Sequence, residues 1–159
     1  MKNKIVDADT LQQIVFEGKK NGKKIVATSG CFDILHAGHV VYLEAAASMG
    51  DIFILFLNSD SSVRKLKSEK RPIVPERERA IVISGLACID YICIFDETTP
   101  CQIINKVKPD CFIKGGDYKG KRIPEMDVME RVGGKVEYVV MIDGCSTTKI
   151  IERIMKLNS

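Results

Sequence analysis

Continuous apolar runs alternate with longer helical patterns along the chain, and this alternation constrains the fold more than any other feature of its 159 residues. The runs, such as 52–57, show no regular exchange of apolar and polar residues, which is typical of strands covered on both faces of a parallel sheet. Strands that alternate with helices across short connections form right-handed βαβ units. The sequence therefore predicts the α/β class, with a doubly wound parallel sheet of five strands.

The order of the patterns fixes where each element is expected. Strands are expected at 24–28, 52–58, 91–95, 111–114 and 136–141. Helices are expected at 9–20, 40–49, 61–66, 76–86, 100–106, 124–131 and 147–156. Asp9 or Thr10 is expected to cap the first helix, and Asn21-Gly22 to end it. Because no repeat or linker interrupts this order, we expect residues 1–159 to form a single Rossmann-like domain, with 1–22 as an N-terminal helical extension.

Charge and apolar content argue against two classes of partner. The net charge is +3, and basic residues alternate with acidic ones, as in 67–71, so a nucleic-acid partner is not expected. The longest apolar run, 52–57, falls far short of the ~20 residues of a membrane span. The first residues carry no apolar segment of a secretory signal. We expect neither a membrane nor a nucleic acid as a partner.

The six cysteines lie mostly inside apolar runs, and no two of them form a Cys-x-x-Cys pair. Buried free thiols behave as small apolar side chains and persist in reducing compartments. With no cluster at metal-ligand spacing, a zinc site is disfavoured. We therefore expect a cytoplasmic protein without metal-ligating residues.

The only two histidines, His36 and His39, stand three residues apart between a predicted strand and a predicted helix. Free backbone N–H groups and the helix dipole favour an anion at such a turn. Gly38 removes a Cβ where the chain must pass close to a ligand. The pattern predicts a phosphate site with two imidazole donors. The alternative is that one histidine caps the turn while the other packs in the core.

Two further segments carry candidate phosphate ligands. At 30–33, Gly30 permits a tight exit from the strand, and Asp33 either braces the turn or binds the substrate or a cation. At 146–148, three hydroxyl residues precede the last helix, where they either cap it or hold triphosphate oxygens. Between these segments, Lys65 and Lys67 could reach phosphates and Arg79 could form a bidentate clamp, unless they only form a solvated face.

Topology indicates where these segments meet. In a doubly wound sheet the ligand lies beyond the carboxyl ends of the strands, where the strand order reverses. With the first strand central, the reversal falls between the first and fourth strands. The two most unusual loops, 30–39 and 114–118, follow these two strands. Neither a Gly-x-x-x-x-Gly-Lys-[Ser/Thr] loop nor a Gly-x-Gly-x-x-Gly turn is present, so P-loop and dinucleotide-binding enzymes are disfavoured.

The segments 30–39 and 144–148 together resemble the cytidylyltransferase-like branch of the nucleotidyltransferases. His36 and His39 match the family's His-x-Gly-His motif, and 146–148 match its second signature. From about residue 22 onward the chain resembles more closely the adenylyltransferase half of the ADP-heptose synthases. That closer resemblance rests on the segments 28–33, 58–60, 71–72, 114–118 and 143–148.

The resemblance implies transfer of AMP from ATP, with Mg²⁺, to D-glycero-D-manno-heptose 1-phosphate. It implies catalytic roles for His36 and His39. We expect Lys65 and Lys67 to join them as cations that reach the phosphates, and Asp60 and Tyr118 to contact the substrate. The candidate nucleotide-binding residues are Gly30, Cys31, Phe32, Asp33, Gly38, Arg79, Lys114, Gly115, Asp117, Ser146, Thr147 and Thr148. Many such enzymes are fused to a sugar kinase. This chain has no room for one, so it resembles the stand-alone form, a homodimer or higher oligomer served by a separate heptose kinase and phosphatase.

Two departures bear on the alternatives. Ser29 stands where the heptose enzymes usually carry Asn, which is a small change. Met141 stands where glycerol-3-phosphate cytidylyltransferases carry Arg, which argues against that branch. The FAD synthetases share the first motif without the pairing of 114–118 with 144–148. The residues alone leave open ATP or CTP, and leave open a non-catalytic nucleotide-binding module.

Overall fold

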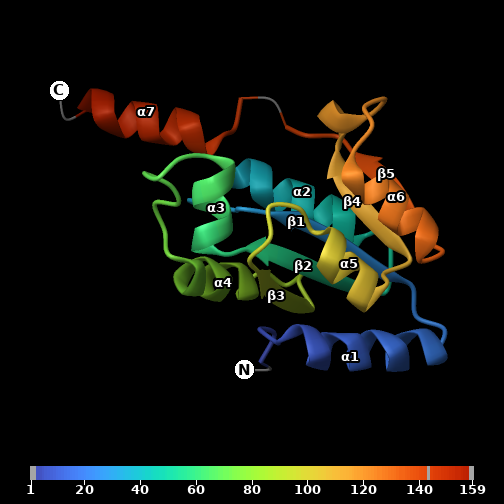
Figure 1. The fold of residues 1–159 in the computed structure, drawn as a ribbon. Helices are drawn as coiled ribbons and strands as arrows, with labels where there is room; N and C mark the ends of the chain where they lie inside the picture. The colour runs from blue at the N-terminus through green and yellow to red at the C-terminus, as the bar shows by residue number, and fades with distance from the viewer. Residues whose placement is uncertain (1–2, 143, 158–159) are drawn as a thin grey trace.

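A five-stranded parallel sheet forms the centre of the computed structural model, which describes residues 3–142 and 144–157 (Figure 1). Its strands are β1 (Ile25–Gly30), β2 (Ile52–Asn58), β3 (Tyr91–Phe95), β4 (Cys111–Gly115) and β5 (Lys135–Val139). They lie in the order β3-β2-β1-β4-β5, and every neighbouring pair is parallel. The predicted α/β class and doubly wound sheet are confirmed, and the order reverses between β1 and β4 as expected.

Helices connect the strands and cover both faces of the sheet (Figure 1). They are α1 (Ala8–Lys20), α2 (Ala37–Ala47), α3 (Asp60–Leu66), α4 (Glu76–Ser84), α5 (Cys101–Val107), α6 (Pro124–Arg131) and α7 (Thr147–Leu157), with a 3₁₀ turn, η1 (Gly116–Tyr118). Among the helices of the described residues, none is long and apolar enough to cross a bilayer.

Strand β2 shows why the apolar runs are continuous. Successive side chains of a strand point to opposite faces. Ile54 and Phe56 pack in the apolar layer beneath α1, α5 and α6, whereas Phe53, Leu55 and Leu57 pack in the layer beneath α2 and α4. Because both layers are buried, neither face of the strand needs a polar residue.

A buried polar cluster fixes the start of α2 to the sheet, next to the candidate functional site described below. The Thr28 hydroxyl on β1 lies 2.7 Å from the Tyr42 hydroxyl on α2, and the two lie 2.9 and 3.1 Å from the Ile113 carbonyl of β4, so one hydroxyl donates to the other and the second donates to the carbonyl. Burial raises the pKa of Tyr42 to about 12, so its hydroxyl remains a donor. The cluster sets α2 at the point where the strand order reverses.

The N-terminal segment packs as an integral part of the fold. Leu11 and Val15 of α1 are buried in the same apolar layer as α5, and Ile5 forms a parallel bridge to Ile92 of β3. The expected cap of α1 is wrong: Asp7, rather than Asp9 or Thr10, accepts a hydrogen bond from the Thr10 amide at 2.7 Å. The expected end at Asn21-Gly22 is confirmed, with Gly22 at a φ of 73°.

Two elements near the candidate functional site have bounds that differ from those predicted. Helix α2 begins at Ala37 and not at residue 40, so His39 lies in its first turn. Strand β5 ends at Val139 and not at Met141. The apolar residues 140–142 are exposed, because the pairing partner of Val139 is Gly115, the last residue of β4, and no partner strand continues beyond it.

Candidate functional site

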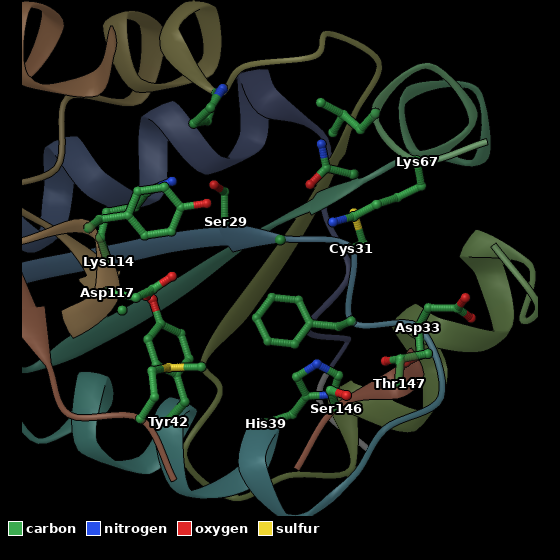
Figure 2. Close-up of a pocket in the computed structure, with 18 of the residues that line it drawn as sticks. Ser29, Cys31, Asp33, His39, Tyr42, Lys67, Lys114, Asp117, Ser146 and Thr147 are labelled. Carbon is green, nitrogen blue, oxygen red and sulfur yellow. The ribbon is translucent and has the colours of Figure 1, made fainter. Parts of the chain in front are cut away.

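A cavity of about 650 Å³ lies at the carboxyl ends of the strands, within the ~300–1,000 Å³ that ligand pockets usually occupy (Figure 2). Its walls come from the loop after β1, the end of α3, the loop after β3, the end of β4 with η1, and the start of α7. The site predicted at the topological switch point is therefore present as a cavity.

The two histidines lie against each other in this cavity. Their ring centroids are 3.7 Å apart and their planes are tilted by 20°. His36 occupies the N-cap position of α2 but its side chain caps nothing, so the capping alternative is wrong. Among the described residues, the Nδ1 atoms of both rings are buried without a hydrogen-bond partner. Buried polar atoms are usually hydrogen-bonded, and exceptions such as these two nitrogens are found at catalytic sites among other places.

Burial controls the protonation of this pair. It lowers the pKa of His39 to about 4, with a further lowering by His36 that the Asp33 carboxylate opposes. Burial also lowers the pKa of His36. Without a ligand, both imidazoles are therefore neutral at pH 7, and each has one N–H donor and one acceptor nitrogen. The stacked rings disfavour two positive charges at once.

Gly38 serves contacts within the protein rather than the approach of a ligand. A Cβ there would lie 2.9 Å from the Cβ of Cys145 and 3.1 Å from the His36 ring. The residue lies outside the cavity lining. Its lack of a side chain lets the second signature, which includes Cys145, come close to the histidine turn.

Asp33 braces the histidine loop. Its side chain is 1% exposed and accepts hydrogen bonds from Arg71 Nε at 2.7 Å, the Ile73 amide at 2.8 Å and the Val74 amide at 2.9 Å. Burial alone would raise the pKa of Asp33, but these donors and the Arg71 charge outweigh it, so the pKa lies below its ordinary value. Of the predicted alternatives, the structure shows the brace.

The same loop holds backbone strain close to the histidines. Phe32 and Ile34 have φ values of 45° and 48°, a region that side chains rarely adopt. The Phe32 ring lies 5.0 Å from the His39 ring, and Gly30 allows this because a Cβ there would lie 2.6 Å from the Phe32 ring. The Asp33 brace between them holds this conformation in place.

Arg79 contradicts the prediction of a phosphate clamp. It is 2% exposed and lies outside the cavity lining. Its guanidinium donates to the carbonyls of Val74, Cys31 and Asn58 at 2.9, 2.6 and 2.9 Å, and to Asp60 Oδ1 at 2.8 Å. With these donors used inside the protein, Arg79 ties four segments together. Asp60 is its partner and also lies outside this cavity, so the structure does not bring Asp60 to the predicted substrate site.

The basic segment contributes a different pair of cations from the one predicted. Lys67, at the end of α3, lines the cavity, whereas Lys65 is exposed on α3 and lies outside it. Arg71 lines the cavity instead, oriented by its bond to Asp33. Sequence reasoning missed Arg71, although it stands in the same basic run.

The start of α7 closes another wall. The Ser146 hydroxyl accepts from the Lys149 amide at 3.2 Å, as an N-cap does, and the Thr147 hydroxyl donates to the Asp33 carbonyl at 2.6 Å. Thr148 also lines the cavity. These hydroxyls therefore cap α7 and tether it to the histidine loop, and the residues at its start line the cavity. Asp143, which begins the second signature, lies outside the described residues.

The end of β4 brings a buried ion pair that was not predicted. Lys114 Nζ lies 2.9 Å from Oε1 of Glu125 in α6, and 4.7 Å from the centroid of the Tyr118 ring. Gly115 leaves room for the carboxylate of Asp117, since a Cβ at Gly115 would lie 2.6 Å from Asp117 Oδ1. No sequence signal marks Glu125, because it reads as an ordinary acidic residue of a helix's first turn.

Most of the candidate residues meet in this one cavity. Those that line it are Gly30, Cys31, Phe32, Asp33, His36, His39, Lys67, Lys114, Gly115, Asp117, Tyr118, Ser146, Thr147 and Thr148. Lining residues that sequence reasoning missed include Tyr42, Asn58, Arg71, Thr98, Thr99 and Glu125. Within residues 3–142 and 144–157, no three His, Cys, Asp or Glu side chains are grouped so as to hold a metal ion. All six cysteines are free thiols, and Cys145 is exposed.

Fold and cavity together define an α/β domain that can hold a phosphate-bearing ligand at the carboxyl edge of its sheet. Residues 27–153 match the cytidylyltransferase-like family, and the chain belongs to this family. It is 52% identical to the bifunctional protein HldE of Geobacter metallireducens over 96% of this chain, and 49% identical to that of Pelobacter propionicus over 97%. The chain spans about a third of the length of these relatives, 31% and 32%.

Solved structures agree with this placement. The lipopolysaccharide core biosynthesis protein from Thermoplasma volcanium GSS1 is 30% identical with a TM-score of 0.62, over 76% of this chain and 98% of that one. A pantoate-β-alanine ligase from Francisella tularensis, complexed with β,γ-ATP and β-alanine, has a TM-score of 0.59 at 12% identity, over 98% of this chain and 79% of that one. The second likeness shows the shared fold alone.

Proposed function

We propose that this chain transfers AMP from ATP to D-glycero-D-manno-heptose 1-phosphate, giving ADP-heptose and pyrophosphate. One observation carries the proposal of nucleotidyl transfer: a stacked pair of neutral histidines with buried, unpartnered Nδ1 atoms shares a cavity with Lys67, Arg71 and the start of α7. The choice of ATP and heptose is supported by the resemblance to ADP-heptose synthases and by about 50% identity to the HldE proteins over nearly the whole chain.

The reaction depends more on the positioning of the two reactants than on acid–base catalysis. An oxygen of the sugar phosphate forms a bond to the α-phosphorus of ATP, and the bond to the bridging oxygen of pyrophosphate breaks. A phosphomonoester is already ionised at neutral pH, since its second pKa is about 6, so no general base is needed. The obstacle is the approach of two anions. Fixed donors and cations that hold them in line supply the catalysis.

The cavity residues divide this work by position. The N–H groups of His36 and His39 donate to the α-phosphate and to the bridging oxygen. Lys67 and Arg71 offset the charge of the phosphates, and the first turn of α7 with Ser146 holds the β- and γ-phosphates. On the other wall, Gly115, Asp117 and Tyr118 lie where a nucleoside or sugar would extend from them.

We infer that Mg²⁺ enters as the ATP complex. Mg²⁺ in nucleotide sites is held mainly by phosphate oxygens and water, with few protein ligands, so the ATP phosphates would supply much of its coordination. The ion adds positive charge at the phosphates and leaves with pyrophosphate.

We further infer a homodimer or higher oligomer in the cytoplasm, with the kinase and phosphatase steps that supply heptose 1-phosphate carried by other domains or chains. The oligomer is supported by α7, which is tethered at its start but has no buried residue and exposes the apolar Met155 and Leu157 near its end (Figure 1). An isolated helix of 11 residues is marginal in water, so an apolar partner would stabilise it. Light scattering after size-exclusion chromatography tests the oligomer, and a monomer at micromolar concentration contradicts it.

Pyrophosphate release by the purified protein tests the reaction. ATP, CTP and GTP are each paired with heptose 1-phosphate and with glycerol 3-phosphate, in the presence of Mg²⁺. We expect turnover with ATP and heptose 1-phosphate. Turnover only with CTP and glycerol 3-phosphate would refute the proposed substrates but support the proposed nucleotidyl transfer. ATP binding without any turnover would favour the non-catalytic binding module.

A further inference from the structure

The cavity has a second wall on the far side of the sheet from the histidines. His39 lies on α2, which packs in the apolar layer of one face. Helices α5 and α6 pack in the layer of the opposite face, and α5 contacts α6. Thr98, Thr99 and Pro100, just before α5, and Ile123, Pro124 and Glu125, at the start of α6, line this second wall. We call these six residues and Lys114 the distal lobe.

Glu125 is the unusual group of the distal lobe. It is 4% exposed, and its Oε1 lies 2.9 Å from Lys114 Nζ. Its other oxygen, Oε2, has no hydrogen-bond donor among the described residues. Desolvating a carboxylate and an ammonium is costly, and one bond between them recovers only part of that cost. Oε2 is not among the buried atoms without a partner, so it is open to the cavity, where it can accept a hydrogen bond.

The chemistry of the distal lobe differs from that of the histidine wall. Lys114 keeps two further N–H donors beside Glu125, and the Thr98 and Thr99 hydroxyls can donate or accept. Pro100, Ile123 and Pro124 add an apolar surface for C–H groups. A carboxylate repels a phosphate, whereas it accepts well from a hydroxyl. The set is therefore complementary to a neutral, hydroxyl-rich ring whose phosphate lies at the histidine wall.

We propose that the distal lobe binds the hydroxyl-bearing part of a polyhydroxylated sugar phosphate, and that Glu125 determines this specificity by accepting a hydrogen bond from a sugar hydroxyl on Oε2. The inference rests on the proposed function, since it places the acceptor of that reaction. Lys114 then acts as a positioning residue, because it fixes the carboxylate through Oε1.

Kinetics with Glu125→Gln test the assignment. The amide keeps an oxygen for Lys114 and removes the charge that faces the sugar. We expect the KM for heptose 1-phosphate to rise about 10- to 100-fold, as for a lost hydrogen bond to a charged group, with the KM for ATP unchanged within about twofold. Asp127→Asn is the matched control, because Asp127 lies in the same first turn of α6 but pairs with Arg122 at the surface. It should leave both KM values unchanged.

Analogues of heptose 1-phosphate that each lack one hydroxyl identify the hydroxyl that Glu125 binds. They also distinguish this contact from a structural role of Glu125. One monodeoxy heptose 1-phosphate should lose about as much kcat/KM with the wild-type protein as Glu125→Gln loses with the full sugar, and should lose nothing more with the variant. An equal rise in both KM values, or equal penalties for every analogue in variant and wild type, overturns the assignment. If Glu125→Gln does not fold, the kinetics of the wild-type protein with the analogues decide. An unchanged kcat/KM with every analogue would overturn the assignment, because no single hydroxyl would then be bound by the protein. Absence of turnover in the wild type with full sugar and ATP refutes the proposed function instead.

Discussion

Replacement of Arg79 by Met separates a structural role for this side chain from the phosphate clamp that the sequence suggested. The guanidinium donates to three backbone carbonyls and one carboxylate, and it joins the histidine loop, the end of β2, the start of α3 and the segment before α4. Met fills similar volume and donates nothing. The carbonyls of Cys31, Asn58 and Val74 then lose their donor, and Asp60 loses its cation.

The expected cost follows from these lost partners. Each buried acceptor left without a donor costs about 1–3 kcal/mol, and loss of one member of a buried ion pair typically costs about 3–5 kcal/mol. Because the Asp60 side chain is partly exposed and water can reach it, we count only the three carbonyls and take the lower part of their summed range, about 3–5 kcal/mol for the whole replacement. At roughly 2–4 °C per kcal/mol for a chain of this size, the melting temperature should fall by roughly 6–20 °C.

Differential scanning calorimetry measures this fall, and Arg77→Met is its control. Arg77 lies on the same helix with the same charge but is exposed, so its replacement should change stability by less than about 0.5 kcal/mol. ATP affinity is measured for both variants at a temperature where each is folded. A melting temperature within about 2 °C of the wild type, together with loss of ATP binding, would refute the structural role and restore the clamp.

Three further replacements or titrations test the site. His39→Ala should lower kcat at least about 100-fold with the fold intact by circular dichroism, and retention of more than about a tenth of wild-type kcat would contradict its role. Asp33→Asn should lower the melting temperature and raise the KM for ATP, since one amide cannot accept from all three donors; unchanged values would show that the brace is dispensable. With only two histidines in the chain, proton NMR can follow both: His39 should not titrate near pH 6.5, and a midpoint there would contradict its burial. Because its folded-state pKa of about 4 lies below the unfolded value of 6.5, the stability it contributes is complete above pH 6.5 and is lost as the pH falls toward 4.

The fold was largely predictable, because its determinants are local and periodic. Continuous apolar runs identified every strand of the described sheet. The reversal of strand order between β1 and β4 was predicted from a central first strand, and the unusual loops after those two strands agreed with it. The predicted bounds were wrong where strand pairing decides the end of an element. Residues 140–142 are as apolar as a strand, yet β5 stops at Val139 because β4 offers no partner beyond Gly115.

The site was predictable where function leaves a local signature and unpredictable where tertiary contacts assign the role. His36 and His39 stand out because both rings share one short turn. Arg79 and Arg71 look alike in sequence, but the first is buried against carbonyls and the second reaches the cavity. No local sequence pattern distinguishes Glu125, because its role depends on the buried ion pair that it forms with Lys114 of β4.

Neutral histidines suit the proposed reaction better than charged ones would. With a pKa of about 4, His39 is protonated in roughly one molecule in a thousand at pH 7 before ATP binds. A fixed cation would attract the ground-state triphosphate strongly, and binding shared by ground and transition states does not speed the chemical step. A neutral N–H donor binds the bridging oxygen weakly while it is esterified, and more strongly as charge develops on it. The burial that keeps the pair neutral thereby shifts its stabilisation toward the transition state, which is why loss of His39 should lower kcat more than it weakens ATP binding.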